Sequence, residues 1–98
     1  MPAPVRDRPT VLSFTREEAW VAHVALLAQL RAAVDADDSK PDYPEVDALD
    51  AVEADSDRFE PQHVRVIRDA LVSYLGDAPV RDRAPGRDAL QAVNAALH

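Results

Sequence analysis

The sequence contains no cysteine, which excludes disulfide bridges, zinc sites built from thiolates and thiol catalysis. Its two glycines, Gly76 and Gly86, do not make a glycine-rich loop that could cradle a phosphate. Long apolar runs are missing too. The longest stretch of the main apolar segment without charge or proline is residues 19–30, short of the about 20 residues that span a bilayer. Because the first residues also lack an apolar segment of the secretion-signal type, we expect a cytoplasmic protein that binds no membrane.

The charge of the 98 residues is strongly negative, with 11 Lys and Arg against 18 Asp and Glu and a net charge of -7. This balance argues against a nucleic-acid binder that works by bulk charge. Asp outnumbers Glu 13 to 5 and Arg outnumbers Lys 10 to 1, a composition typical of salt-adapted proteins; codon bias in a GC-rich genome is the alternative. In molar salt a Debye length of about 3 Å screens the repulsion within such a chain. Residues 17–57 carry a net charge of -10 and residues 58–98 a net charge of +1, which favours the C-terminal half as a binding surface.

The N-terminal part of the sequence predicts an extended arm followed by one long helix. Residues 1–14 contain three prolines and no helical period, and we expect residues 11–14 to lie against the body of the protein. Thr15 and Glu18 have the spacing of a capping box, which predicts a helix over residues 16–36. The side of this helix predicted to face the core carries Trp20, His23, Val24, Leu27, Leu30 and Val34, with Leu26 at the margin. The opposite side carries smaller residues, among them Ala22, Ala25 and Ala32.

Three further helices are expected, over residues 45–54, 61–75 and 86–97. Pro44 and Pro61 suit the first turns of two of them, because a first-turn residue needs no N–H donor. The apolar residues predicted to face inward are three or four positions apart: Val46, Leu49 and Val52, then Val64, Ile67, Leu71, Tyr74 and Leu75, then Leu90, Val93 and Leu97.

Glycine and proline are expected to separate the last two helices. Gly76 is predicted to end the third helix, because glycine is free to adopt a positive φ at no side-chain cost, and a loop is predicted through Pro79 and Pro85. No strand pattern competes, so the predicted fold class is all-α: a compact bundle of three to four helices, with residues 1–14 as the arm and residues 15–98 as a single helical domain. The predicted core consists of Trp20, Val24, Leu27, Leu30, Ile67, Leu71 and Tyr74.

Few residues offer chemistry. His23 lies on the apolar side of the first helix, where a histidine is most often a core residue with satisfied ring nitrogens; a metal site formed with His63 is the alternative. The acidic cluster in residues 35–42 lacks the glycine and the bidentate carboxylate that a calcium loop needs, which predicts a solvated loop. No serine lies in a Gly-x-Ser-x-Gly turn, and no paired carboxylates lie in an apolar setting. We therefore expect no enzyme, no cofactor and no metal.

A non-enzymatic interaction or regulatory module is the function that this inventory favours, either as a homodimer or with a protein partner. The homodimer is motivated by residues expected to be small or apolar and exposed: Ala22, Ala25, Ala32, Val66 and Val72. The residues of the expected interaction surface are Arg65, Arg68, Val72, Arg81 and Arg83. The alternative is a helical DNA-associated transcriptional accessory that uses Arg65 and Arg68 on the helix over residues 61–75. Acidic residues interleave with these arginines and allow pairs such as Arg65 with Asp69, so nucleic-acid binding is disfavoured.

One short segment, Pro-Val-Arg-Asp-Arg, occurs twice, at residues 4–8 and 79–83. The flanking sequences do not match, so the chain has no repeat architecture. Chance recurrence is expected in a chain rich in these residue types, and a docking peptide present in two copies is the alternative.

Several short segments together resemble small uncharacterised proteins of haloarchaea. They are Thr15-Arg16-Glu17-Glu18-Ala19-Trp20 with His23 and Leu26-Leu27, then Arg58-Phe59-Glu60-Pro61, Arg68-Asp69-Ala70-Leu71 and Arg81-Asp82-Arg83. The resemblance spans most of residues 14–97. It implies a salt-adapted helical protein and carries no activity or binding residue across.

Overall fold

The computed structural model of the protein describes residues 10–37, 43–54 and 58–97. In these residues the elements follow the order β1 (Thr10–Val11), α1 (Arg16–Ala36), α2 (Pro44–Glu53), β2 (Arg58–Phe59), α3 (Pro61–Leu75) and α4 (Val80–Ala96). The predicted all-α bundle is confirmed. The predicted limits of the first and third helices agree with the structure, because their start signals are local.

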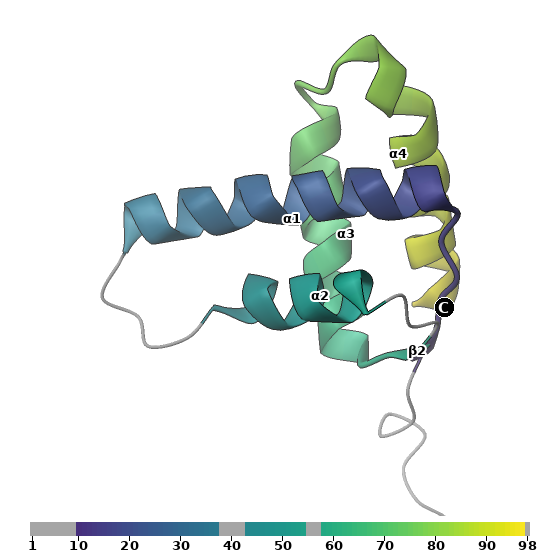
Figure 1. Ribbon diagram of the computed structural model, residues 1–98, viewed down its shortest axis with the longest axis horizontal. Helices are drawn as coiled ribbons and strands as arrows, with labels where there is room; N and C mark the ends of the chain where they lie inside the picture. The colour runs from purple at the N-terminus through teal and green to yellow at the C-terminus, as the bar shows by residue number, and fades with distance from the viewer. Residues whose placement is uncertain (1–9, 38–42, 55–57, 98) are drawn as a thin grey trace, which may run out of the picture.

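The four helices of the described chain form two layers (Figure 1). Helices α1 and α2 run antiparallel, side by side, and cross in front of α3, which lies beside α4. Helix α1 contacts all three other helices, so it holds the two layers together. No helix in residues 10–37, 43–54 or 58–97 is long and apolar enough to cross a membrane.

The start of α1 follows from its capping box. The backbone N–H of Glu18 donates to the Thr15 hydroxyl at 3.2 Å, and the backbone N–H of Thr15 donates to the Glu18 carboxylate at 2.8 Å. Two donors that the first turn leaves without helical partners are thus satisfied, and Glu17 and Glu18 lie at the positive end of the helix dipole. The predicted capping box is confirmed.

The described part of the N-terminal arm is fastened to the segment before α3. Strand β1 pairs antiparallel with β2, with Thr10 opposite Phe59 and Val11 opposite Arg58. Leu12 is buried, and the ring of Phe14 meets that of buried Phe59 edge to face, with centroids 6.1 Å apart. These two-residue strands are too short for a sequence pattern to reveal, and it is the burial of Leu12 and Phe59 that holds them together.

The side of α1 that faces the core differs from the predicted one. The buried residues of this helix are Val21, Ala22, Ala25 and Leu26, whereas Trp20 is 61% exposed. Small alanines let α3 and α4 approach the backbone of α1 closely, and Val21 and Leu26 fill the space beside them. The indole of Trp20 would hold the neighbouring helices apart, so the prediction that the tryptophan side is the core side is wrong.

The other predicted core residues differ in how deeply they are buried. Ile67 and Leu71 of α3 are fully buried, as predicted. Leu27, Leu30 and Tyr74 are partly buried against the core, and Val24 is also partly buried. The homodimer face loses its basis in part, since Ala22 and Ala25 belong to the core. In α2, Leu49 and Ala48 are buried, but Val46, predicted to face inward, is 39% exposed.

Helix α4 begins six residues before its predicted start and contains Pro85. A proline has no N–H to bond the carbonyl one turn earlier, which is why the sequence favours a loop there. Packing of the buried residues Asp82, Gly86 and Ala89 compensates for the missing hydrogen bond. A Cβ on Gly86 would lie 2.6 Å from Cδ2 of Leu75, so this glycine permits the close approach of α4 to α3.

The end of α3 agrees with its prediction, because the helix stops at Leu75 and Gly76 is the C-cap residue. The φ of Gly76 is -60° and its ψ is -34°, an ordinary right-handed conformation, so the positive φ that a glycine allows is not used here. The backbone N–H of Asp77 donates to the carbonyl of Tyr74 at 3.1 Å and continues the turn. The chain reaches α4 within a few residues, without a left-handed conformation at Gly76.

Candidate interaction surface

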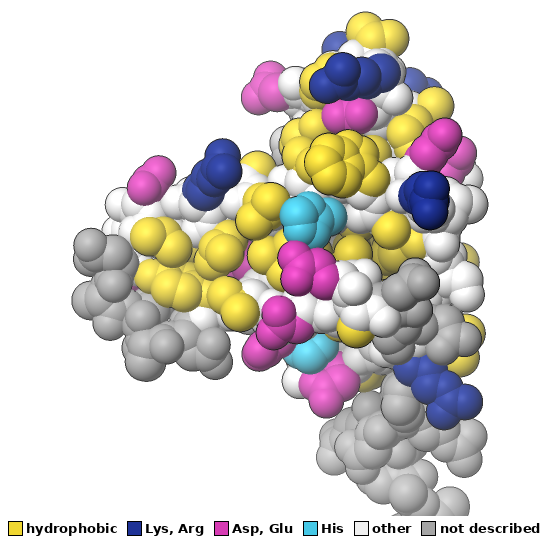
Figure 2. Space-filling view, viewed as in Figure 1, with side chains coloured by type: hydrophobic (Ala, Val, Ile, Leu, Met, Phe, Trp, Pro, Cys, Tyr) yellow, Lys and Arg dark blue, Asp and Glu magenta, His cyan; other side chains and the backbone are white. Residues whose placement is uncertain are grey.

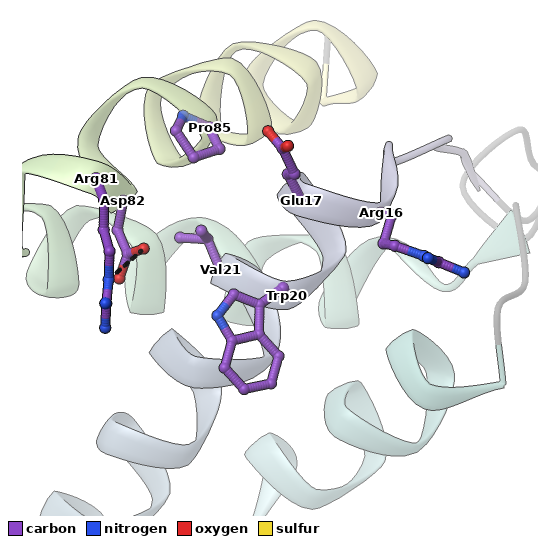
Figure 3. A pocket seen from close by; sticks show the side chains of 7 residues that line it. All are labelled: Arg16, Glu17, Trp20, Val21, Arg81, Asp82 and Pro85. Carbon is purple, nitrogen blue, oxygen red and sulfur yellow. Dashed lines mark ion pairs between the residues drawn. The ribbon is translucent and has the colours of Figure 1, made fainter.

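A groove of about 660 Å³ lies where the first turns of α1 and α4 meet (Figure 3). It is open to solvent and combines one aromatic ring with side chains of both charges. The residues that line it are Arg16, Glu17, Trp20 and Val21 of α1 and Arg81, Asp82 and Pro85 of α4. A mixed lining around an exposed ring is typical of surfaces that recognise another molecule.

Trp20 is the most unusual residue of this groove. It is the single tryptophan of the sequence, and 61% of its surface is accessible. Its ring stacks on that of His23, with centroids 6.1 Å apart and an interplanar angle of 18°. The stacking orients the indole without covering it. An oriented, exposed tryptophan is the residue type most often found to dominate the energy of a protein interface.

His23 links α1 to α2 beneath this ring. Its Nε2 lies 3.0 Å from Oε1 of Glu53, and because a carboxylate accepts only, the imidazole N–H is the donor. Its Nδ1 is buried without a hydrogen-bond partner. His63 lies 3.7 Å from the carboxylate of its own neighbour Glu60. The two histidines therefore pair with different acids, and the described residues contain no group of three potential metal ligands.

The buried acid of the groove has a structural partner. Oδ2 of Asp82 accepts a hydrogen bond of 2.7 Å from the hydroxyl of Tyr74, which ties α3 to the first turn of α4. This hydrogen bond, then burial and then the negative charge of Asp82 raise the pKa of Tyr74 above 10.0, and Arg81 opposes the shift. Nε of Arg81 approaches Oδ1 of Asp82 at 3.9 Å. Asp82 thus holds two helices together.

Beyond the groove, the side of α1 that faces away from α3 carries large apolar residues along its length, with the exposed Arg31 between Leu27 and Val34. We name Trp20, Val24, Leu27 and Val34 the outer face of α1. Both ends of this face are exposed, with Trp20 at one end and Val34, 38% exposed, at the other; Val24 and Leu27 between them are partly buried. Figure 2 shows hydrophobic side chains gathered over α1 and continuing onto α2, where Val46 is exposed. Exposed apolar patches on proteins are a common feature of contact surfaces.

The five residues predicted as an interaction surface fall into two separate groups. Arg65, Arg68 and Val72 lie on the side of α3 away from its buried residues, and Val72 is 57% exposed. Arg81 and Arg83 lie in the first turns of α4, which follows the C-terminal end of α3. Arg65 lies ten residues of helix, about 15 Å, before that end, whereas Val72 lies three residues before it. The structure therefore separates Arg65 from the arginines of α4.

Local contacts also engage some of these arginines. Arg68 lies 3.5 Å from the carboxylate of Asp69, and Nε of Arg83 donates to the carbonyl of Ala78 at 3.2 Å. The second copy of the repeated pentapeptide, residues 79–83, forms the N-cap and first turn of α4, and the first copy lies outside the described residues. Of the acidic cluster in residues 35–42, the described part ends α1, with Asp37 as its C-cap residue.

Sequence reasoning missed the exposure of Trp20 and Val34 because it assigned them to the core. A signal was present: α1 carries apolar or small residues on nearly every side, and its charged residues gather at its ends apart from Arg31. A helix of this kind in a 98-residue protein has more apolar surface than three neighbours can cover. One apolar side of α1 must then face solvent or a partner.

Comparison with known proteins gives the family of the chain. The model of a family of unknown function, DUF7853, matches residues 12–94, so the chain belongs to this family. The matched range includes all four described helices except the last residues of α4. No curated protein and no solved structure matches the chain.

Proposed function

We propose that this member of the DUF7853 family is a small, non-enzymatic protein-interaction module of a salt-adapted cytoplasm, and that it binds through the outer face of α1. The observation that carries the proposal is the 61% exposure of Trp20, the largest side chain of the sequence. Arg16 and Arg81 flank the ring and can contact polar groups at the rim of an interface.

The exposure of Trp20 leaves a substantial free energy available for binding. A tryptophan buries up to about 250 Å², so an exposed fraction near 0.6 leaves roughly 150 Å² accessible. At about 25 cal/mol per Å², covering this area contributes roughly 4 kcal/mol. A single residue of this weight suits an anchor whose neighbours exclude water from the contact.

The acids of the groove support binding rather than catalysis. The carboxylate of Asp82 is held by the Tyr74 hydroxyl. Glu17 lies exposed in the first turn of α1.

Affinity capture from a native lysate in molar salt tests the proposal, with bound protein and nucleic acid both identified. The wild-type chain is expected to retain a specific protein that Trp20→Glu loses. The matched control is Val72→Glu, which places the same charge at a similarly exposed position on α3. If Trp20→Glu still retained the partner and Val72→Glu lost it, the binding surface would lie on α3. Absence of any specific partner, including a second copy of the chain, would refute the proposal.

The alternative proposal, a DNA-associated accessory, is supported by the outward positions of Arg65 and Arg68 on α3. The same capture distinguishes it from a protein-interaction module. DNA that is retained by the wild-type chain and lost when both arginines are replaced by glutamate would favour the alternative.

A further inference from the structure

Resting on the proposed function, we propose that the partner on the outer face of α1 is a second copy of this chain. The two copies pack with their α1 helices antiparallel, and the two-fold axis passes through Leu27. In such a dimer, residue i of one copy meets residue 54 − i of the other. The spacing, exposure and charge of the residues of α1 support this arrangement.

The large apolar residues of α1 outside its buried side are spaced symmetrically about Leu27. Trp20 and Val24 of the outer face precede it by seven and three residues, and Val34 of the outer face follows it by seven. Leu30, partly buried beside the outer face, follows it by three. The two-fold operation therefore places Trp20 on Val34, Val24 on Leu30 and Leu27 on its own copy. A two-fold interface must be self-complementary, and this spacing meets that requirement.

The sizes and exposures of these residues also match across the axis. Trp20, the large exposed residue at one end of the face, would lie on Val34, an exposed smaller residue at the other end. Val46 of α2 adds to the second end, because α1 and α2 run antiparallel and the Tyr43 hydroxyl, just before α2, donates to the carbonyl of Asp37 at the end of α1. Each copy thus contributes one large exposed side chain, Trp20, and one apolar surface, formed by Val34 and Val46, on which Trp20 of the other copy packs.

Arg31 has a complementary partner under the same operation. Arg31, the one basic residue in positions 17–37 of the sequence, would meet His23 of the second copy, whose Nε2 is hydrogen-bonded to the exposed carboxylate of Glu53. The operation also sets Glu17 of one copy against Asp37 of the other, and molar salt screens this repulsion. The antiparallel arrangement also pairs opposite ends of the two helix dipoles.

The size of the surface is at the lower end of what a dimer needs. Helix α1, with 21 residues, is about 31 Å long and α2, with 10 residues, is about 15 Å long, and each is about 10 Å wide. The projected area of α1 and α2 is therefore roughly 450 Å², and the accessible area of a corrugated side-chain layer is larger. Stable dimers bury about 800 Å² on each copy. Because the contact is mainly apolar, it persists in molar salt, where surface ion pairs are screened.

Disulfide cross-linking of single-cysteine variants tests this geometry directly, since the sequence has no cysteine of its own. After mild oxidation in molar salt, Leu27→Cys is expected to form a covalent dimer, because the axis places the two copies of residue 27 in contact. Val34→Cys is expected to stay monomeric in a denaturing gel. Its two copies would lie about 21 Å apart along the helix, beyond the about 7 Å between Cα atoms that a disulfide tolerates. Val72→Cys, on α3, is the control for random collision.

The molar mass measured by light scattering completes the test. The wild-type chain is expected to give twice the monomer mass, and Trp20→Glu the monomer mass. A dimer that cross-links through Val34→Cys as readily as through Leu27→Cys would be parallel and would overturn the proposed geometry. If the wild-type chain gave the monomer mass at all concentrations, the proposal that the partner is a second copy would be wrong. If the capture experiment then retained a different protein that depends on Trp20, the proposed function would stand; if it retained nothing, both would fall.

Discussion

Replacing Leu26 or Leu27 by alanine asks which side of α1 faces the core. The two leucines are neighbours on the same helix, so the change in helix propensity is the same for both and cancels in the comparison. Leu26 is fully buried, whereas Leu27 is partly buried on the outer face. The pattern of large apolar residues in the sequence predicts the opposite order of burial, with Leu27 in the core and Leu26 at its margin.

The expected difference follows from burial. Leu26→Ala removes a side chain with no accessible surface and leaves a cavity, which costs about 3 to 5 kcal/mol. Leu27→Ala exposes part of a side chain that already meets solvent, leaves no closed cavity and costs about 1 kcal/mol. Domains of this size are stable by about 5 to 15 kcal/mol, so Leu26→Ala removes a large fraction of the stability and lowers Tm by 10 °C or more, roughly.

Urea unfolding followed by circular dichroism measures both values. The protein is diluted until the midpoint no longer depends on its concentration, which removes any contribution of self-association through Leu27. The salt concentration is held constant, because the strongly acidic chain changes its repulsion with ionic strength. If Leu27→Ala lowers the free energy of unfolding as much as Leu26→Ala or more, α1 is rotated relative to the arrangement described above. The outer face of α1 would then face the core.

Two further predictions concern local contacts. Tyr74→Phe is expected to cost about 1 to 2 kcal/mol at pH 7, because Asp82 loses its donor. Since the folded state raises the pKa of Tyr74, the wild-type stabilisation is present below pH 10 and is lost as the pH rises through the higher folded value. The difference in unfolding free energy between the wild-type protein and Tyr74→Phe should therefore become smaller above pH 10. A difference that does not change with pH would contradict this reasoning. Thr15→Ala is expected to cost about 1 kcal/mol by removing the N-cap of α1, measured by thermal unfolding against exposed Ser13→Ala; equal losses in the two variants would show that the cap contributes nothing specific.

Part of the fold could be predicted because its signals are local. The capping box of Thr15 and Glu18 involves groups three residues apart, and the fixed φ of Pro61 favours the first turn of α3 wherever that helix packs. Pro85 shows the limit of such signals. Its missing N–H weakens a helix locally, but the packing around Gly86 keeps α4 helical through it.

The candidate surface was predictable only in part. The sequence directed attention to the arginines of α3 and α4, and Arg81 does line the groove beside Trp20. Trp20 itself was placed in the core, since hydrophobicity gives a large aromatic residue more weight than an alanine. Where three helices meet a fourth, the distance between their backbones matters more, and Ala22 and Ala25 allow the closer approach.

By itself, the sequence determined the helical class, the limits of α1 and α3 and the acidic composition. These depend on capping groups, proline and residue counts, which act within a few positions or by simple addition. The tertiary structure alone decided which side of α1 is buried, because that helix is apolar or small on almost every side and its period cannot choose between them. It also placed Trp20 at the surface and paired Asp82 with Tyr74, since both outcomes depend on helices that are distant in the sequence and close in space.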